Sequence, residues 1–311
     1  MNLAVSSASA TDRPSPFAPP PPRLRPEPRH DAIVTPGAAL LGALLLILYA
    51  PVLAGLVRQW WNNPNYSHGF LVLPLALWLV WRSRERWRHL PPAPRPSGLA
   101  LMAAALALLA VGSVGAVLFL SRISLLLMIA GLTVFLAGWP RLRAWRFPLG
   151  YALFMIPLPA IIYYQITFPL QVLASRMAAI CLDVLQIPAL REGNLIILPR
   201  QTLAVAQACS GIRSLFALLA LAVAYAYLAE PRPWRRITLA LLMLPIAIVS
   251  NGVRIVATGV LTYYFGALWA EGTLHASAGF VMFSVALGLL LLAHRLLAGI
   301  SRPDHGRGAV A

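Results

Sequence analysis

One apolar stretch decides the fold class: RITLALLMLPIAIVSNGVRIVATGVLT, residues 236–262. A helix of this length can cross the hydrocarbon core of a bilayer, which is roughly 30 Å thick. The composition agrees, because 59% of the residues are hydrophobic and 11% are charged, whereas soluble domains carry about 25% charged residues. The sequence therefore predicts an all-α polytopic membrane protein.

Apolar runs of this kind recur along the chain, and we expect about eight of them to span the bilayer. The expected spans are 37–57, 67–82, 97–120, 123–140, 146–163, 210–229, 236–262 and 275–296. Together they form a transmembrane domain over 37–296. Residues 1–36 are rich in Pro, Ala and Ser and are expected to be a disordered tail. A second short tail is expected at 297–311.

The distribution of basic residues predicts the orientation, since basic loops stay in the cytoplasm. All 25 basic residues are arginines. Eighteen of the 25 lie in the N-terminal tail and at 82–95, 141–146, 232–236 and 295–307, which alternate with the expected spans. Both termini are therefore expected in the cytoplasm. We attribute the net charge of +16 to this topology and not to nucleic-acid binding.

This orientation places residues 164–208 outside the membrane. The run 166–187 looks apolar enough to span, but it holds polar residues that are costly at mid-bilayer. These are Gln171, Arg176 and Asp183. We therefore expect a helix in the membrane interface. The following stretch, 192–207, is rich in β-branched residues with a Pro-containing break, and it predicts a small external hairpin.

A thiol and a guanidinium near the outer ends of two expected spans are candidates for an acyl-transfer site. Cys209 precedes the span 210–229, where the helix N-terminus favours a thiolate. Arg213 lies one turn further on and adds a positive charge. Arg254 lies about 27 Å above Arg236, close to the outer surface. It can stabilise an oxyanion, although snorkelling to lipid headgroups is the structural alternative.

An imidazole completes this candidate site. His275 opens the last expected span from the outer side and can act as general base and acid. A histidine that only forms interfacial hydrogen bonds is the alternative. Only His68 also reaches the outer face, and the other four histidines, among them His294, are expected to be solvated. Cys181 lacks comparable neighbours and is expected to be a packing residue.

Several other classes of protein fit the sequence less well. It has no His-Glu-x-x-His metal motif, no Gly-x-Ser-x-Gly nucleophile elbow and no carboxylate inside an expected span. No metal and no organic cofactor is therefore expected. A transporter needs polar residues at mid-membrane or paired broken helices, and the centres of these spans are nearly pure Ala, Leu and Val. A transporter and a non-catalytic assembly factor remain the alternatives.

Four stretches resemble the exosortase/archaeosortase family. They are Tyr66-Ser-His-Gly-Phe-Leu-Val, the run from Glu192-Gly-Asn-Leu-Ile to Ala-Cys209-Ser-Gly-Ile-Arg213, Asn251-Gly-Val-Arg254-Ile and His275-Ala-Ser-Ala-Gly279. The resemblance implies a site made by Cys209, Arg254 and His275. The supporting or substrate-binding residues would be His68, Gln207, Ser210, Arg213 and Asn251. The family usually has an acidic residue where this chain has Gln207.

The resemblance also implies an activity and a location. The enzyme would cleave a C-terminal sorting signal of the Pro-Glu-Pro type on exported proteins and pass the new C-terminus to an acceptor through a Cys thioester. A membrane endopeptidase with water as acceptor stays open. The location would be a bacterial cytoplasmic (inner) membrane, with the site facing the periplasm. Glu230 or anionic lipid would meet the basic cluster that ends the signal.

The predicted orientation can be tested by labelling with a membrane-impermeant thiol reagent. A single cysteine introduced near Pro199, in a variant without native cysteines, should be labelled from the periplasmic side of intact cells. A single cysteine near Arg86 should be labelled only after the cells are permeabilised. The reverse pattern would overturn the orientation.

Overall fold

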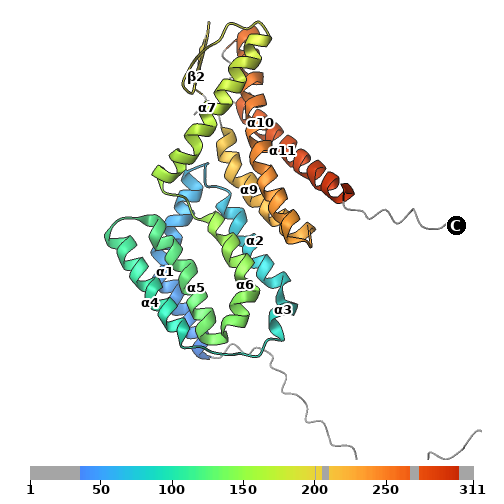
Figure 1. The fold of residues 1–311 in the computed structure, drawn as a ribbon. Helices are drawn as coiled ribbons and strands as arrows, with labels where there is room; N and C mark the ends of the chain where they lie inside the picture. Colours follow the sequence, from blue (N-terminus) through green and yellow to red (C-terminus); the bar gives the residue numbers. More distant parts are fainter. Residues whose placement is uncertain (1–35, 200, 205–209, 267–272, 301–311) are drawn as a thin grey trace, which may run out of the picture. The chain divides into compact units, whose positions relative to one another are not determined.

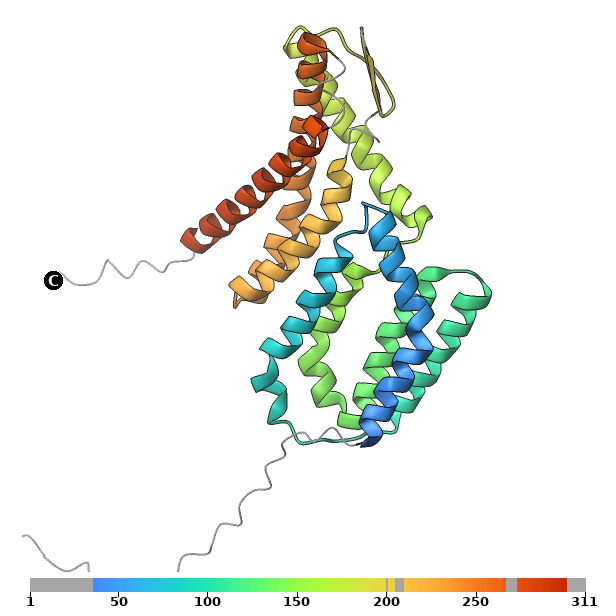
Figure 2. The same ribbon diagram turned by 180° about the vertical axis from the view of Figure 1, so that it is seen from behind.

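The computed structural model describes residues 36–199, 201–204, 210–266 and 273–300. The chain divides into two compact units, 1–42 and 43–311. Only the beginning of α1 is described in the first unit, and the features discussed below belong to the second. Figures 1 and 2 show the ribbon from opposite sides.

Helices make up most of the described chain. They are α1 (Pro36–Asn62), α2 (Gly69–Arg82), α3 (Arg84–Arg88), α4 (Ser97–Val114), α5 (Leu118–Ala137), α6 (Trp139–Tyr151), the short 3₁₀ helix η1 (Ala152–Met155), α7 (Ala160–Val184), α9 (Ser210–Ala229), α10 (Pro233–Phe265) and α11 (Thr273–Ile300). The helical content follows from the environment, because a helix satisfies all of its backbone hydrogen bonds within one segment while it crosses lipid.

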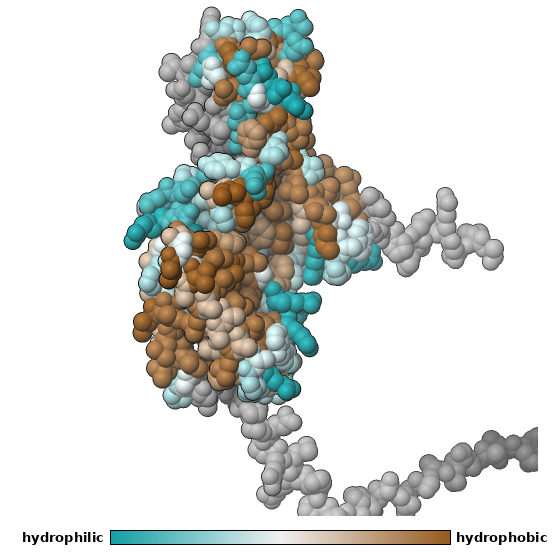
Figure 3. Space-filling model, turned by 60° about the vertical axis from the view of Figure 1, so that its left-hand side comes forward, coloured by the Kyte–Doolittle hydropathy of each residue, from teal (hydrophilic) through white to brown (hydrophobic). Residues whose placement is uncertain are grey.

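Six of the described helices are long and apolar enough to cross a membrane: α1, α4, α5, α7, α10 and α11. Helix α2 and residues 215–229 of α9 are apolar but shorter. Many large apolar side chains on α1, α4 and α11 are exposed, and Figure 3 shows hydrophobic residues over a broad part of one face. Such surfaces are stable in lipid and not in water. The chain is therefore an all-α polytopic membrane protein, as predicted.

The expected continuous span over 146–163 is wrong. Helix α6 ends at Tyr151, η1 follows, and α7 starts only at Ala160. Pro157 and Pro159 explain the break, because proline lacks an N–H group and disfavours helical geometry in the residue before it. Ile156, which precedes Pro157, is indeed extended.

Helix α6 and η1 nevertheless run from the loop before α4 back to the C-terminal end of α1. At one end, Arg141 donates a hydrogen bond to the carbonyl of Leu90 in the basic loop, at 3.0 Å. At the other end, Trp60 of α1 donates to the carbonyl of Met155 in η1, at 2.9 Å. The chain thus returns from the arginine-rich loop to the C-terminal end of α1.

Helix α7 occupies the region where an interfacial helix was expected. It has 25 residues and is apolar enough to span, so its composition allows either position. Its buried residues include Ala174, Ala178 and Leu182, whereas Arg176 and Asp183 are exposed. Helix α7 therefore has one packed face and one face that carries charge. Asp183 lies in the last turn, so a carboxylate does occur within a helix of spanning length.

Two contacts fix the direction of α7 relative to its neighbours. Tyr163 in the first turn stacks on Phe216 of α9, with ring centroids 6.0 Å apart. Leu182 in the last turn packs beside Gly259 of α10. Measured from the turn between α9 and α10, Phe216 and Gly259 lie at heights of about 20 Å and about 39 Å. Helix α7 therefore runs away from that turn.

The predicted hairpin is present as a three-stranded antiparallel sheet in the order β1-β2-β3. The strands are β1 (Leu190–Glu192), β2 (Leu195–Leu198) and β3 (Gln201–Ala204). The first turn needs a positive φ, which Gly193 supplies at 60°. Ser175 of α7 donates a hydrogen bond to the carbonyl of Gly193 at 2.9 Å. Ile196 of the sheet belongs to one buried cluster with α7 and with Ile255 of α10.

A buried ionic cluster joins α9, α10 and α11 at the opposite end. Glu230 follows α9 and is 4% exposed. Its carboxylate lies 3.4 Å from Nη1 of Arg235 and 2.9 Å from Nε2 of His294 on α11. The Tyr225 hydroxyl hydrogen-bonds to Nδ1 of His294 at 2.5 Å. His294 was expected to be solvated, and that expectation is wrong because this cluster binds both of its ring nitrogens.

Loss of the Glu230 charge should destabilise the packing of these three helices. Glu230→Gln leaves Arg235 buried without a counter-charge, which typically costs about 3 kcal/mol or more. We expect a clearly lower melting temperature in detergent. Glu85→Gln is the matched control, because the side chain of Glu85 is 72% exposed and surface pairs contribute little. Equal melting of the two variants would contradict a stabilising role for the cluster.

Candidate functional site

Helices α9, α10 and α11, which carry five of the eight candidate residues, pack against one another. Helix α10 contacts α9, α11 and α7, and α11 also contacts α9. The ribbon views agree with this arrangement (Figures 1 and 2). Since the connection from α9 to α10 is short, the N-terminal end of α9 and the C-terminal half of α10 lie on the same side of this group.

Heights along the helices place the start of α9 level with Arg254. Helix α9 has 20 residues and begins at Ser210, so its start is about 30 Å from the turn. Arg254 comes 21 positions after Pro233, the first residue of α10, which is about 31 Å from the same turn. Cys209 is the residue before Ser210 in the sequence. Two candidate residues far apart in the sequence, Ser210 and Arg254, thus lie at the same level of the helix group.

Helix α11 brings the third candidate toward this level. Gly279 of α11 lines the same small cavity as Arg254. His275 lies one helical turn before Gly279, within α11. The backbone of His275 is therefore about 6 Å nearer the start of α11 than Gly279, which lines the cavity beside Arg254.

The Arg254 side chain is held between helices and does not extend into lipid. It is 2% exposed. The cavity beside it measures about 20 Å³ and is lined by Leu218, Ala247, Ser250, Asn251, Arg254, Gly279, Met282 and Phe283. A space of this size accommodates about one water molecule. This burial argues against the snorkelling alternative.

Arg254 belongs to a buried polar stripe on α10. Ser250, Thr258 and Thr262 are also buried. With Arg254 they recur every four residues, which puts them on one face of the helix. Ser250 Oγ and Thr262 Oγ1 have no hydrogen-bond partner among the described residues. The sequence analysis identified Asn251 and Arg254 but missed these hydroxyl groups. Their four-residue spacing from Arg254 is the signal in the sequence that could have found them.

The other candidate residues are described only in part. Gln207 and Cys209 lie outside the described residues. Ser210 and Arg213 belong to α9, and His275 belongs to α11, but their side chains are also outside the described part. Cys181 is exposed on α7, so it is not the buried packing residue that the sequence suggested. Among the described residues no group of three or more His, Cys, Asp or Glu side chains could hold a metal ion.

His68 lies in a separate cavity that borders α9. Its Nε2 is 3.1 Å from the carbonyl oxygen of Phe154. Burial lowers the pKa of His68, opposed by hydrogen bonds to the backbone, which favours a neutral ring that donates from Nε2 at neutral pH. The cavity measures about 270 Å³ and is lined by Tyr66, His68, Gly150, Leu153, Phe154, Ile156, Leu158, Tyr163 and Phe216. His68 and Arg254 thus line different cavities.

The glycine that follows His68 has a packing reason. A Cβ atom at Gly69 would lie 2.3 Å from Nε1 of Trp60, which is closer than any real contact. Only glycine lets α2 approach the Trp60 indole, and this approach holds His68 beside η1.

Comparison with known proteins gives one match. A family model described as Transmembrane exosortase (Exosortase_EpsH) matches residues 60–292, which is well over half of the chain. No curated protein and no solved structure matches. The matched range includes all eight candidate residues from His68 to His275 and reaches from the end of α1 into α11.

Substitution of Arg254 by lysine separates a directional hydrogen-bond role from charge alone. Lysine keeps the charge but lacks the planar, five-donor geometry of the guanidinium. We expect Arg254→Lys to remain folded and to lose activity on a sorting substrate by at least about tenfold. Arg176→Lys on the exposed face of α7 is the matched control. Activity of Arg254→Lys at the wild-type level would show that only the positive charge matters.

Proposed function

The chain belongs to the transmembrane exosortase family, and on that premise we propose that it is a cysteine transpeptidase or protease. The family is one of membrane-embedded sorting enzymes. Our proposal assigns the chemistry to Cys209, Arg254 and His275. The observation that carries it is the packing of α9, α10 and α11, in which the start of α9, the buried Arg254 and the first turns of α11 lie at one end.

The proposed reaction begins at Cys209. The chain enters the N-terminus of α9 directly after this residue, and unpaired N–H groups there favour the thiolate over the thiol. The thiolate attacks the carbonyl carbon of the scissile peptide bond. The oxygen gains negative charge, and the guanidinium of Arg254 stabilises that oxyanion.

His275 moves the protons of the reaction. As a general acid it protonates the leaving amine, so that the C–N bond breaks and a Cys209 thioester remains. As a general base it then takes a proton from the acceptor, which attacks the thioester and expels the Cys209 thiolate, so that His275 is protonated again. Water as acceptor gives hydrolysis, and an amine or hydroxyl acceptor gives transfer. The mass of the released product distinguishes the two.

The substrates we propose are exported proteins with a C-terminal sorting signal of the Pro-Glu-Pro type. Glu230 was a candidate partner for the basic cluster that ends such a signal. The structure buries Glu230 and pairs it with Arg235 and His294, so that role is withdrawn. We assign the basic cluster to anionic lipid at the cytoplasmic surface, which attracts basic segments.

The proposed orientation in the inner membrane places both termini in the cytoplasm and the site at the periplasmic surface. The direction of α7 supports it, because α7 runs away from the arginine-rich turn before α10. Helix α10 has 33 residues, about 50 Å, and is longer than a bilayer core of roughly 30 Å. Its C-terminal part and α7 can therefore project outward together.

Cys209→Ala should abolish processing while the protein still inserts into the membrane. Cys209→Ser should keep little activity, because an alkoxide is far harder to form than a thiolate. The measurement is an immunoblot of an exported substrate in a strain that carries only the variant enzyme. Cys181→Ala is the matched control and should process normally, since Cys181 is exposed on α7. Full processing by Cys209→Ala would overturn the assignment of the nucleophile.

A further inference from the structure

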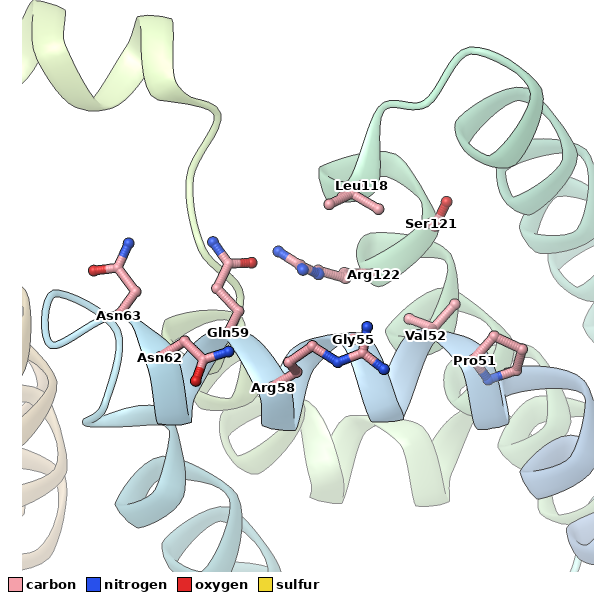
Figure 4. A pocket seen from close by; sticks show the side chains of 10 residues that line it. All are labelled: Pro51, Val52, Gly55, Arg58, Gln59, Asn62, Asn63, Leu118, Ser121 and Arg122. Carbon is pink, nitrogen blue, oxygen red and sulfur yellow. The ribbon is translucent and has the colours of Figure 1, made fainter.

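A second polar site lies between α1 and α5, away from α9–α11. It is a pocket of about 420 Å³ lined by Pro51, Val52, Gly55, Arg58, Gln59, Asn62, Asn63, Leu118, Ser121 and Arg122. Figure 4 shows Arg122 extending from α5 toward the side of α1 from which Gln59 and Asn63 project. The α1 residues follow helical spacing, so they form one continuous stripe.

The pocket carries two positive charges and no described counter-charge. None of its lining residues is acidic, and no ion pair to Arg58 or Arg122 occurs in the described part of the chain. Arg122 is 4% exposed. Burial raises the pKa of Tyr66, so this phenol, which lies within electrostatic range of Arg122, is neutral and does not compensate it. A buried guanidinium without a counter-ion is costly, and an anionic ligand would remove that cost.

The shape of the pocket indicates an amphipathic ligand. Arg58 lies one turn before the C-terminal end of α1, and Arg122 lies one turn after the N-terminal end of α5. Both helices are long and apolar enough to span, and a bilayer core is roughly 30 Å thick, so we expect the two guanidiniums near the level of the lipid phosphates. The stripe continues along α1 through Gly55 to Val52 and Pro51. One end of the pocket is thus cationic and the other is apolar.

Two contacts on either side of the pocket hold α1 against its neighbours. The Tyr49 hydroxyl hydrogen-bonds to Ser124 Oγ of α5 at 3.2 Å. Near the other end of α1, Trp60 donates to the carbonyl of Met155. Between these contacts a Cβ atom added at Gly55 would meet no atom within 4 Å. The space along α1 is therefore open between two fixed points.

We propose that this pocket binds one anionic phospholipid, with its phosphate at Arg58 and Arg122 and an acyl chain along Gly55, Val52 and Pro51. Guanidinium groups bind phosphate oxygens through paired N–H donors. The amides of Gln59, Asn62 and Asn63 provide further donors. The site is separate from the residues assigned to catalysis, so it does not depend on the proposed reaction.

The test uses native mass spectrometry of the full-length protein in detergent, titrated with phosphatidylglycerol. We expect one saturable adduct, and weaker binding of zwitterionic phosphatidylcholine. Arg122→Gln and Arg58→Gln should each weaken phosphatidylglycerol binding by about tenfold or more, since each removes charge-assisted hydrogen bonds. Arg176→Gln, at an exposed arginine of α7, is the matched control and should bind normally.

Gly55→Leu tests the apolar half of the pocket. The added side chain would occupy the space of the acyl chain, so binding of phosphatidylglycerol should fall while both arginines stay in place. Gly288→Leu on α11 is the matched control, because a Cβ atom there also meets nothing within 4 Å. If Arg122→Gln does not fold, Arg58→Gln and Gly55→Leu decide the question.

Three results would overturn the proposal. The first is phosphatidylglycerol binding that neither Arg58→Gln nor Gly55→Leu weakens. The second is saturable binding of inorganic phosphate that displaces the lipid and is unaffected by Gly55→Leu, because it would assign the pocket to a free anion. The third is equal affinity for phosphatidylcholine.

Discussion

The packing of α9 and α11 on α10 is the constraint on which the rest of the structure depends. The buried carboxylate of Glu230 connects the three helices at one end through Arg235 and His294. Breaking such a pair leaves an uncompensated buried charge, so the cluster fixes the relative heights of the helices. Because those heights are fixed at one end, the start of α9 and Arg254 come to the same level at the other. The ionic cluster therefore helps to set the level of Arg254 relative to the start of α9.

Arginine serves two different purposes in this protein. In the connecting loops many arginines, such as Arg86 and Arg95, are exposed, and charges of this kind resist transfer across a bilayer. Arg254 and Arg122 are buried at 2% and 4% exposure, where a charge is stable only with nearby polar groups or an anion. Arg254 lies on a polar stripe of α10, whereas Arg122 faces an open pocket with Arg58. In our proposals, Arg254 stabilises charge that develops in a reaction, and Arg58 and Arg122 hold a resident anion.

The segment from α7 to β3 joins a helix of spanning length to the small three-stranded sheet. Its buried residues Ile196 and Leu182 share one cluster with Ile255, which is adjacent to Arg254 in α10. The sheet is therefore packed against the helix that carries Arg254. The three-stranded sheet is small and gains its stability from packing on α7, because isolated hairpins are marginal in water.

The sequence by itself determined the class of the fold, since apolar runs of spanning length permit only helices in lipid. It also located the hairpin, whose β-branched residues and Gly193 turn are local features. The two prolines Pro157 and Pro159 indicate the break at 152–159. Hydropathy alone does not, because the residues around them are apolar. Only the tertiary structure showed that Glu230 binds His294 and that Arg58 and Arg122 line the same pocket. Those pairs are separated by 64 residues in the sequence, and only helix packing, which no local pattern encodes, brings them together.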